Sequence, residues 1–397
     1  MEVILKIENL YKVFGSNPDD IMPRLRKGGT DKTELLKQTG NTVGLNDVNL
    51  EVYQGEIFVV MGLSGSGKST LVRCINRLIE PTHGRIFFKD QSITEMDGKS
   101  LNLLRRKNMS MVFQSFALLP HRSVLDNVAF GLELMGVDKK ERRESAAQML
   151  ATVGLEGYED SMPSELSGGM QQRVGLARAL CTQPDILLMD EAFSALDPLI
   201  RNEMQDELTA LQHTMRKTII FITHDLDEAL KIGDRIAIMK DGAVVQVGTP
   251  EEILKDPADD YVRDFVQNVN RARVITASAI MKRPRFLTIP KEGPNSAVKI
   301  MRDNSISSLF VVGADKTLKG VISIEKALQL AKNKENNIES VLDPVLSVAP
   351  DTVIDDILPM FLSQSFPIAV VNEENKLKGI LFKSSVISGI SKEEYTK

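Results

Sequence analysis

The sequence has few cysteines and histidines, no long apolar run and no excess of basic residues. Cys74 and Cys181 are its only cysteines and it has four histidines, which is too few for a disulfide framework or a zinc site. We therefore expect both thiols to be buried packing residues. With 49 Lys+Arg against 54 Asp+Glu, the net charge argues against a dedicated nucleic-acid binder.

Membrane and export signals are also missing from the sequence. No run of about 18 apolar residues occurs, so no membrane span is predicted. The first ten residues, MEVILKIENL, lack the basic-then-apolar pattern of a secretory leader, so we expect a cytosolic location.

A chain of 397 residues suggests two or three domains. Up to about residue 270, short apolar runs alternate with helical patterns, and several runs are continuous, as in strands buried on both faces of a parallel sheet. These runs are 57–61, 109–113, 186–189, 218–222 and 236–239. The pattern predicts an α/β domain over 1–270. A polar segment at 17–44 is expected to be a solvated surface insertion with a short helix at 32–37, and residues 116–165 are expected to form a helical subdomain.

An internal repeat follows the first domain. Three anchor segments recur at an offset of 59 residues, as between Leu287 and Leu346. The matching segments are 287–289 with 346–348, 311–312 with 370–371, and 318–320 with 377–379. A gapless repeat predicts two copies of one small α/β unit, at 274–332 and 338–392.

A phosphate-binding loop is indicated by residues 62–69, which read GLSGSGKS after an apolar run and before a helical pattern. Glycines let successive backbone amides point at phosphate oxygens, and the helix N-terminus adds partial positive charge. We expect Lys68 to contact the β and γ phosphates and the Ser69 hydroxyl to bind Mg²⁺. The candidate ATP-binding residues of this loop are Gly62, Ser64, Gly65, Ser66, Gly67, Lys68, Ser69 and Thr70.

Two further segments carry candidate chemistry. Residues 186–191 read ILLMDE, so Asp190 is placed to hold Mg²⁺ through water and Glu191 to polarise a water for attack on the γ-phosphate. Ser167, Gly168 and Gly169 stand at a helix start predicted near residue 171 and form a second anion site. From the residues alone, this site either closes on a nucleotide held by another subunit or is an ordinary helix entry.

These segments, together with Ser194-Ala195-Leu196-Asp197, Gln114 and His224, occur in the order of an ATP-binding-cassette (ABC) ATPase, which residues 1–245 resemble. The resemblance implies that Gln114 senses Mg²⁺ and the attacking water and that His224 contacts the γ-phosphate. It implies that Asp197 lies in a loop crossing a dimer interface. It also implies a homodimer that sandwiches two Mg²⁺-ATP.

The same resemblance implies an aromatic residue that stacks on adenine. Phe14 is the candidate, with Tyr11 a weaker one. The signature departs from the commonest form at Met170, where Gln is usual, and we expect activity to survive because Ser167 and the glycine amides make the phosphate contacts.

Over nearly its whole length the chain more closely resembles ATP-binding subunits of glycine betaine/proline importers, through stretches such as MVFQSFALLPHRSVLDN and the polar insertion. This implies a separate permease with a betaine-binding domain or protein, and a peripheral location on the cytoplasmic side of the membrane. An importer for choline, carnitine or proline, or a soluble ABC ATPase not coupled to transport, are the alternatives.

The repeat resembles a tandem pair of cystathionine-β-synthase-like (CBS) modules, which in such importers implies regulation by ionic strength or cyclic di-AMP. The usual ribose-reading Ser/Thr-x-x-Asp is replaced by SIEK at 323–326 and by FKSS at 382–385, which leaves the ligand open. A basic cluster at Lys282, Arg283 and Arg285 suits either a phosphate ligand or an anionic membrane surface, whose attraction weakens as salt rises. A solvated charged face is the alternative.

Overall fold

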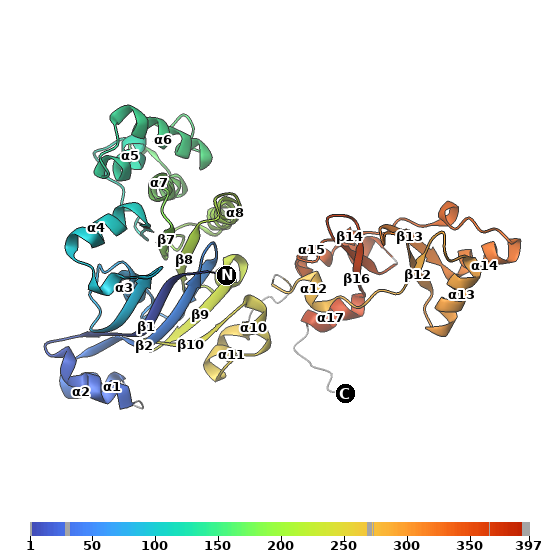
Figure 1. Ribbon diagram of the computed structural model, residues 1–397, viewed down its shortest axis with the longest axis horizontal. Coiled ribbons are helices and arrows are strands. Elements are labelled where there is room, and N and C mark those ends of the chain that lie inside the picture. The colour runs from blue at the N-terminus through green and yellow to red at the C-terminus, as the bar shows by residue number, and fades with distance from the viewer. Residues whose placement is uncertain (1, 28–31, 268–271, 273, 365, 391–397) are drawn as a thin grey trace. The chain divides into compact units, whose positions relative to one another are not determined.

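The computed structural model describes residues 2–27, 32–267, 272, 274–364 and 366–390. It comprises two compact units, Met1–Val269 and Asn270–Lys397 (Figure 1). The predicted boundary near residue 270 falls outside the described residues.

The central sheet of the first unit has the strand order β10-β9-β3-β8-β7-β6 within the described residues. Its strands are β3 (Ile57–Met61), β6 (Met109–Val112), β7 (Ile186–Asp190), β8 (Thr218–Thr223), β9 (Arg235–Lys240) and β10 (Ala243–Gly248). The pairs β6–β7, β7–β8, β8–β3 and β3–β9 are parallel, and β10 is antiparallel to β9. All residues of β3, β7 and β8 are buried. The predicted α/β fold, with strands buried on both faces of a mostly parallel sheet, is confirmed.

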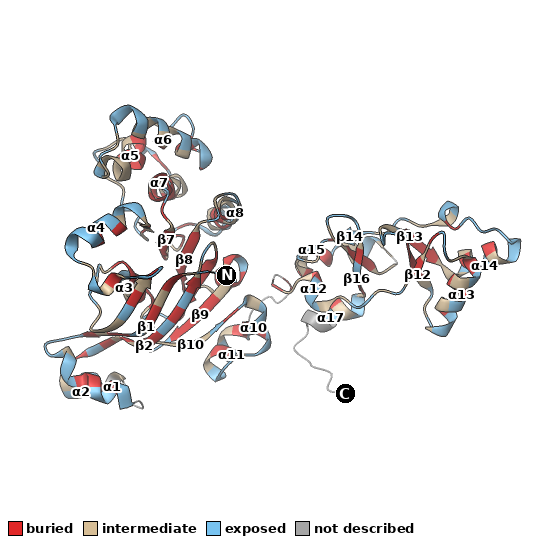
Figure 2. Ribbon diagram, in the orientation of Figure 1, coloured by how far each residue is buried: buried red, intermediate tan, exposed pale blue. Residues whose placement is uncertain are grey.

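A second, antiparallel sheet packs with the central sheet around one apolar core (Figure 2). Its strands, in the order β2-β1-β4-β5, are β1 (Val3–Phe14), β2 (Thr42–Tyr53), β4 (His83–Phe88) and β5 (Gln91–Ser92). Leu5 and Leu10 of β1 are fully buried against Phe58 of β3 and Leu71 of α3 (Lys68–Ile75) in this core. The core therefore holds the start of α3 rigidly at the end of β3.

Three helices form a separate cluster above the central sheet: α5 (Val124–Leu134), α6 (Lys139–Thr152) and α7 (Gly168–Cys181). Ser123 caps α5 by accepting a hydrogen bond from the Asp126 amide. Asn127 is fully buried, and its side-chain amide bonds to backbone groups of residues 119, 122 and 123. This fixes the loop that enters the cluster. Cys74 and Cys181 are buried free thiols, which confirms the prediction.

Further helices of this unit surround the sheets. They are α4 (Gly98–Lys107), α8 (Pro198–Met215), α9 (Leu226–Ile232), α10 (Pro250–Lys255) and α11 (Asp260–Val266), with short 3-10 turns η2 (Ile93–Glu95) and η3 (Pro163–Glu165). Within the residues described, no helix is both long and apolar enough to span a membrane.

The insertion at 17–44 contains η1 (Pro18–Ile21), α1 (Met22–Lys27) and α2 (Lys32–Thr39). It has a core of its own, in which apolar side chains of the insertion pack on strand residues. The members are Ile21, Met22, Leu25 and Leu35, with Tyr11, Val13 and Val43 of β1 and β2. The expectation of a merely solvated segment is wrong for these residues. Four apolar side chains scattered among charges show no clear periodicity, so their burial is visible only once β1 and β2 are placed.

The second unit consists of two similar halves. The first holds β11 (Phe286–Thr288), β12 (Ser308–Val312) and β13 (Leu318–Ser323), with helices α13 (Pro294–Asp303) and α14 (Ile324–Asn333), while α12 (Ala277–Ile280), which precedes them in the chain, packs with the second half. After η5 (Glu339–Val341), the second half holds β14 (Ser347–Val348), β15 (Ile368–Val371), β16 (Leu377–Leu381), α15 (Ile354–Ile357), α16 (Met360–Ser363) and α17 (Lys383–Ile390). Each half has one parallel and one antiparallel strand pair.

The two halves bond to each other through equivalent positions. The Leu318 amide donates to the Asn375 carbonyl at 2.9 Å, and the Leu377 amide donates to the Lys316 carbonyl at 3.1 Å. Both halves contribute to one apolar cluster, Phe310 and Val312 from the first and Ala369 and Leu377 from the second. The 59-residue repeat is thus a pair of structural copies packed face to face.

Candidate nucleotide-binding site

The phosphate loop joins β3 to α3. Gly62 has a φ of 153°, and a Cβ there would lie 2.3 Å from the Met239 carbonyl, so only glycine fits. Gly67, with a φ of 105°, stands at the N-terminus of α3. The loop therefore directs backbone amides and the helix N-terminus toward one point, which suits a phosphate group.

Lys68 is the cation of this loop and is only 5% exposed. Its Nζ donates to the carbonyls of Gly62 at 2.7 Å and Leu63 at 3.1 Å. Burial lowers the Lys68 pKa, while Glu191 and Asp190 act in the opposite direction. The Ser66 hydroxyl is also buried and has no hydrogen-bond partner among the described residues. A phosphate in the loop would give the Ser66 hydroxyl an acceptor and Lys68 an anionic partner.

Oxygen atoms suited to Mg²⁺ meet beside the loop. The Ser69 hydroxyl donates to Asp190 Oδ1 at 2.9 Å, and Arg73 lies 3.6 Å from Asp190 Oδ2. Mg²⁺ prefers hydroxyl, amide and carboxylate oxygens together with waters and substrate phosphates. Ser69 and, through water, Asp190 fit such an ion, because they already share a hydrogen bond, whereas the Gln114 side chain bonds to Glu191 and Ser194.

Glu191 follows β7 directly and faces two of the other candidate residues. Its carboxylate lies 3.5 Å from Gln114 Nε2 and 3.7 Å from His224 Nδ1. Gln114 also donates to the Ser194 hydroxyl at 3.1 Å, which in turn donates to the Glu191 carbonyl at 2.8 Å. Glu191 has a φ of 48°, in the left-handed region that is costly for a non-glycine residue. The fold therefore holds Gln114, Glu191 and His224 around one point near Lys68.

A buried carboxylate next to the loop that carries His224 was not predicted from the sequence. Glu228 of α9 is 7% exposed and accepts a hydrogen bond from Gln205 Nε2 at 3.0 Å. Burial raises the Glu228 pKa, and hydrogen bonds from Thr223 and Gln205 oppose the rise. Since Thr223 precedes His224, Glu228 helps to hold the histidine loop. Glu228 is a charged residue in the first turn of a helix, and nothing in the local sequence indicates that such a residue is buried.

Phe14 lies at the end of β1 and is 40% exposed. A Cβ on Gly44 would stand 2.7 Å from a Phe14 ring carbon and 3.3 Å from Thr70 Cγ2. The ring is therefore beside the phosphate loop and open to solvent on one side. This geometry suits stacking on a nucleotide base.

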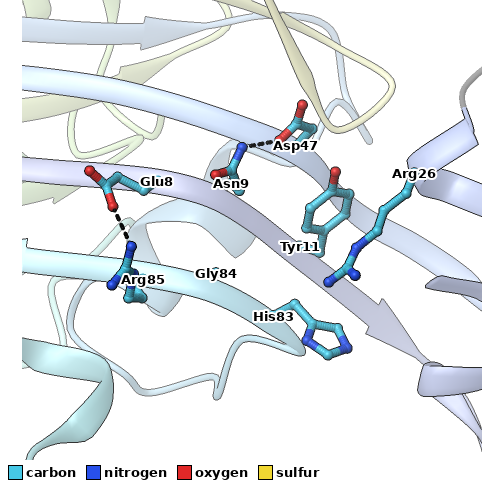
Figure 3. A pocket seen from close by; sticks show the side chains of 8 residues that line it. All are labelled: Glu8, Asn9, Tyr11, Arg26, Asp47, His83, Gly84 and Arg85. Atoms are coloured by element: carbon cyan, nitrogen blue, oxygen red, sulfur yellow. Dashed lines mark hydrogen bonds and ion pairs between the residues drawn. The ribbon is translucent and has the colours of Figure 1, made fainter. Parts of the chain in front are cut away.

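Tyr11, the weaker aromatic candidate, is placed differently. It is 6% exposed and belongs to the core of the insertion. Its ring lies in a groove of about 460 Å³ with Arg26, Asp47 and His83 around it (Figure 3). Burial raises the Tyr11 pKa, with Asp47 adding to the rise. A ring that is only 6% exposed presents too little surface for a base to stack on.

The signature residues start α7, three residues earlier than expected. Ser167 caps the helix by accepting a hydrogen bond from the Met170 amide at 3.3 Å. Asp197 caps α8 in the same way, through the Ile200 amide at 3.1 Å. A Cβ on Gly169 would lie 2.7 Å from Ile200 Cγ2, and one on Gly168 would lie 3.9 Å from Leu196. The two helix starts are therefore neighbours within one chain.

The sheet, loop and carboxylates define a P-loop ATPase with an inserted helical cluster. The family model for the ABC transporter matches residues 45–194, and that for the CBS domain matches 277–333 and 338–392. The chain belongs to the ABC transporter family, as an ATP-hydrolysing transporter subunit with tandem CBS domains.

Curated relatives match the chain over almost its full length. It is 52% identical over 391 residues to the glycine betaine/carnitine transport ATP-binding protein GbuA of Listeria monocytogenes, covering 98% of both chains. It is 52% identical to the glycine betaine transport ATP-binding protein OpuAA of Bacillus subtilis, covering 98% of this chain and 92% of the relative. Identity to the Salmonella typhimurium glycine betaine/proline betaine protein ProV is 49%, covering 99% of each.

Solved structures match the cassette. A dimeric post-hydrolysis ATP-binding cassette, MJ0796 bound to ADP and phosphate, is 32% identical with a TM-score of 0.52, over 62% of this chain and 98% of that one. The cassette CbiO1 of Clostridium perfringens is 29% identical with a TM-score of 0.54, over 68% and 97%.

Proposed function

We propose that this chain is the motor subunit of an importer for glycine betaine or a related quaternary amine or proline. The observation that carries the proposal is the match to betaine-transport ATP-binding proteins across both the cassette and the CBS pair. The proposed partners are a second copy of the chain and permease subunits with a betaine-binding domain or protein, at the cytoplasmic face of the membrane.

We assign the nucleotide site as follows. Phe14 stacks on adenine, and the loop from Gly62 to Thr70 binds the phosphates. Glu191 accepts the proton of the attacking water, while Gln114 and His224, both within 4 Å of its carboxylate, orient that water and the γ-phosphate. Mg²⁺, when bound at Ser69, Gln114 and Asp190, neutralises charge that develops on the phosphate oxygens.

We propose that hydrolysis requires two chains. Ser167 sits on the helical cluster, whereas Lys68 sits at the central sheet, and the amides at the start of α7 suit a phosphate held by a partner copy. Asp197 starts the neighbouring helix and would lie in the same interface. The dimeric state of the matched cassette supports this arrangement.

The domain assignments belong to the same proposal. We assign 1–270 to the ATPase domain with its helical subdomain at 116–165, and 274–332 and 338–392 to the CBS repeats. The helical subdomain, joined to Gln114 by the loop that Asn127 fixes, is the proposed docking site for the permease.

We further propose that the CBS pair binds a phosphate-bearing regulator, such as cyclic di-AMP, or an anionic membrane surface. A cleft of about 840 Å³ in this unit is lined by Lys282, Arg283 and Arg285 together with Ser323 and Phe382. Cations, a hydroxyl and an aromatic ring suit a nucleotide phosphate and base. Calorimetry of the full chain with cyclic di-AMP, ATP or anionic vesicles tests this. Heat that persists when Lys282 and Arg283 are replaced by Ala would remove the cleft from consideration.

The catalytic assignment is tested by Glu191→Gln. We expect ATP binding to persist and hydrolysis to fall about 10²- to 10⁴-fold, the contribution of a positioned base. Glu203→Gln, on the exposed face of α8, is the matched control and should keep normal turnover. Normal turnover in Glu191→Gln would refute the role of Glu191. For the transport role, the protein should remain in washed membranes only when a betaine permease is co-expressed.

A further inference from the structure

The two ends of the insertion join the rest of the chain next to Phe14, the aromatic residue proposed to stack on adenine. The insertion leaves β1 directly after Phe14 and rejoins β2 at Thr42, two residues before Gly44. Gly44 is the residue against which the Phe14 ring and Thr70 lie. Residues of the insertion are therefore held close to the place where a nucleotide would bind.

Lys32, the first residue of α2, lies against a turn of the chain that itself contacts the phosphate loop. The turn at Asp241 and Gly242 joins β9 to β10, and the Gly242 amide donates to the Ser66 carbonyl at 2.9 Å. A Cβ on Gly67 would lie 3.3 Å from Gly242 Cα. The Lys32 ammonium is 3.1 Å from the position that a Cβ on Gly242 would take. One glycine thus separates this ammonium from the loop.

Among the described residues, no carboxylate lies close enough to pair with the Lys32 ammonium. It forms no salt bridge within 4 Å among the residues described, and Asp241 acts on it only at longer range. Its side chain is partly buried, and burial lowers the Lys32 pKa while Asp241 raises it. A partly desolvated cation beside a phosphate loop gains most from an anion that comes within reach.

We propose that Lys32 is a nucleotide-binding residue, a second lysine that contacts the polyphosphate of ATP from the insertion. The inference rests on the nucleotide site proposed above. The insertion thereby becomes part of the binding site, and its folded state bears on affinity for ATP. A lysine acts as a point charge, so the contact would serve ATP and ADP alike.

The test measures binding of Mg²⁺-ATP to the full chain by calorimetry. Lys32→Ala should weaken binding about tenfold, the usual worth of one charge-assisted hydrogen bond. Lys32→Arg should restore most of the affinity. Lys37→Ala, an exposed lysine on the same helix, is the matched control and should bind as the unaltered chain does. Wild-type affinity in Lys32→Ala would overturn the inference.

The Asp241→Asn variant distinguishes a phosphate contact made by Lys32 from a purely structural role of Lys32. If Lys32 contacts phosphate, removing the competing carboxylate should leave ATP affinity unchanged or tighten it. If Lys32 only ties the insertion to the turn, Asp241→Asn and Lys32→Ala should weaken binding equally, and that result rejects the inference. Lys68→Ala keeps the two proposals apart. Should it also bind ATP normally, the nucleotide site itself is wrong, whereas a defect in Lys68→Ala alone removes only the role of Lys32.

Discussion

Leu35→Ala perturbs the small core that holds the insertion in place. Leu35 is 1% exposed and packs with Leu25, Val43 and Tyr11. Truncating a buried leucine costs about 2–5 kcal/mol through lost transfer energy and the cavity left behind. Leu36, the next residue, is 46% exposed, so Leu36→Ala should change stability by no more than about 0.5 kcal/mol.

The loss of stability in Leu35→Ala should be confined to the insertion, because the insertion has a core separate from the central one. Hydrogen exchange of the α2 amides should therefore accelerate strongly in Leu35→Ala, while exchange in β3 and β8 stays slow. ATP affinity should also fall, as expected if the folded insertion positions Lys32. Equal exchange in the Leu35 and Leu36 variants would show that this core does not hold the insertion, and the reasoning would be wrong.

Two other predictions follow from burial. Asn127→Ala should lower the free energy of unfolding by about 3 kcal/mol or more, because it leaves several backbone groups of residues 119–123 without partners. Thermal unfolding of this variant and of the exposed control Asn102→Ala checks the prediction. Equal melting temperatures for the two variants would contradict it. Burial raises the pKa of Cys74 to about 12 and of Cys181 to about 11, so at pH 8 both thiols should react with a disulfide reagent only after unfolding. Rapid labelling of either thiol in the native protein would contradict that burial.

Much of the cassette was predictable because its strands are buried on both faces. Residues 57–61, 186–189 and 218–222 form continuous apolar runs, and the structure has strands at all three within a residue or two. The phosphate loop was equally predictable, because its glycines are required by the local backbone conformation. Gly62 could not carry a side chain beside the Met239 carbonyl.

Features that depend on distant contacts could not be predicted. The start of α7 was expected near residue 171, but with the Ser167 cap the helix begins at Gly168, although glycine is a poor helix former. Neither the burial of Leu35 nor that of Glu228 has a local signature. The first depends on β1 and β2, and the second on Gln205 of another helix. Sequence patterns report local preference, while these positions are decided by tertiary packing.

The reciprocal backbone bonds between the two halves of the second unit make each half resemble one subunit of a dimer. A solitary half would expose Phe310 and Val312, and its pairing with another copy would depend on dilution. Fusion in one chain replaces that dependence with a high effective concentration. The paired unit should consequently stay assembled at any expression level, even where the cassettes themselves have come apart.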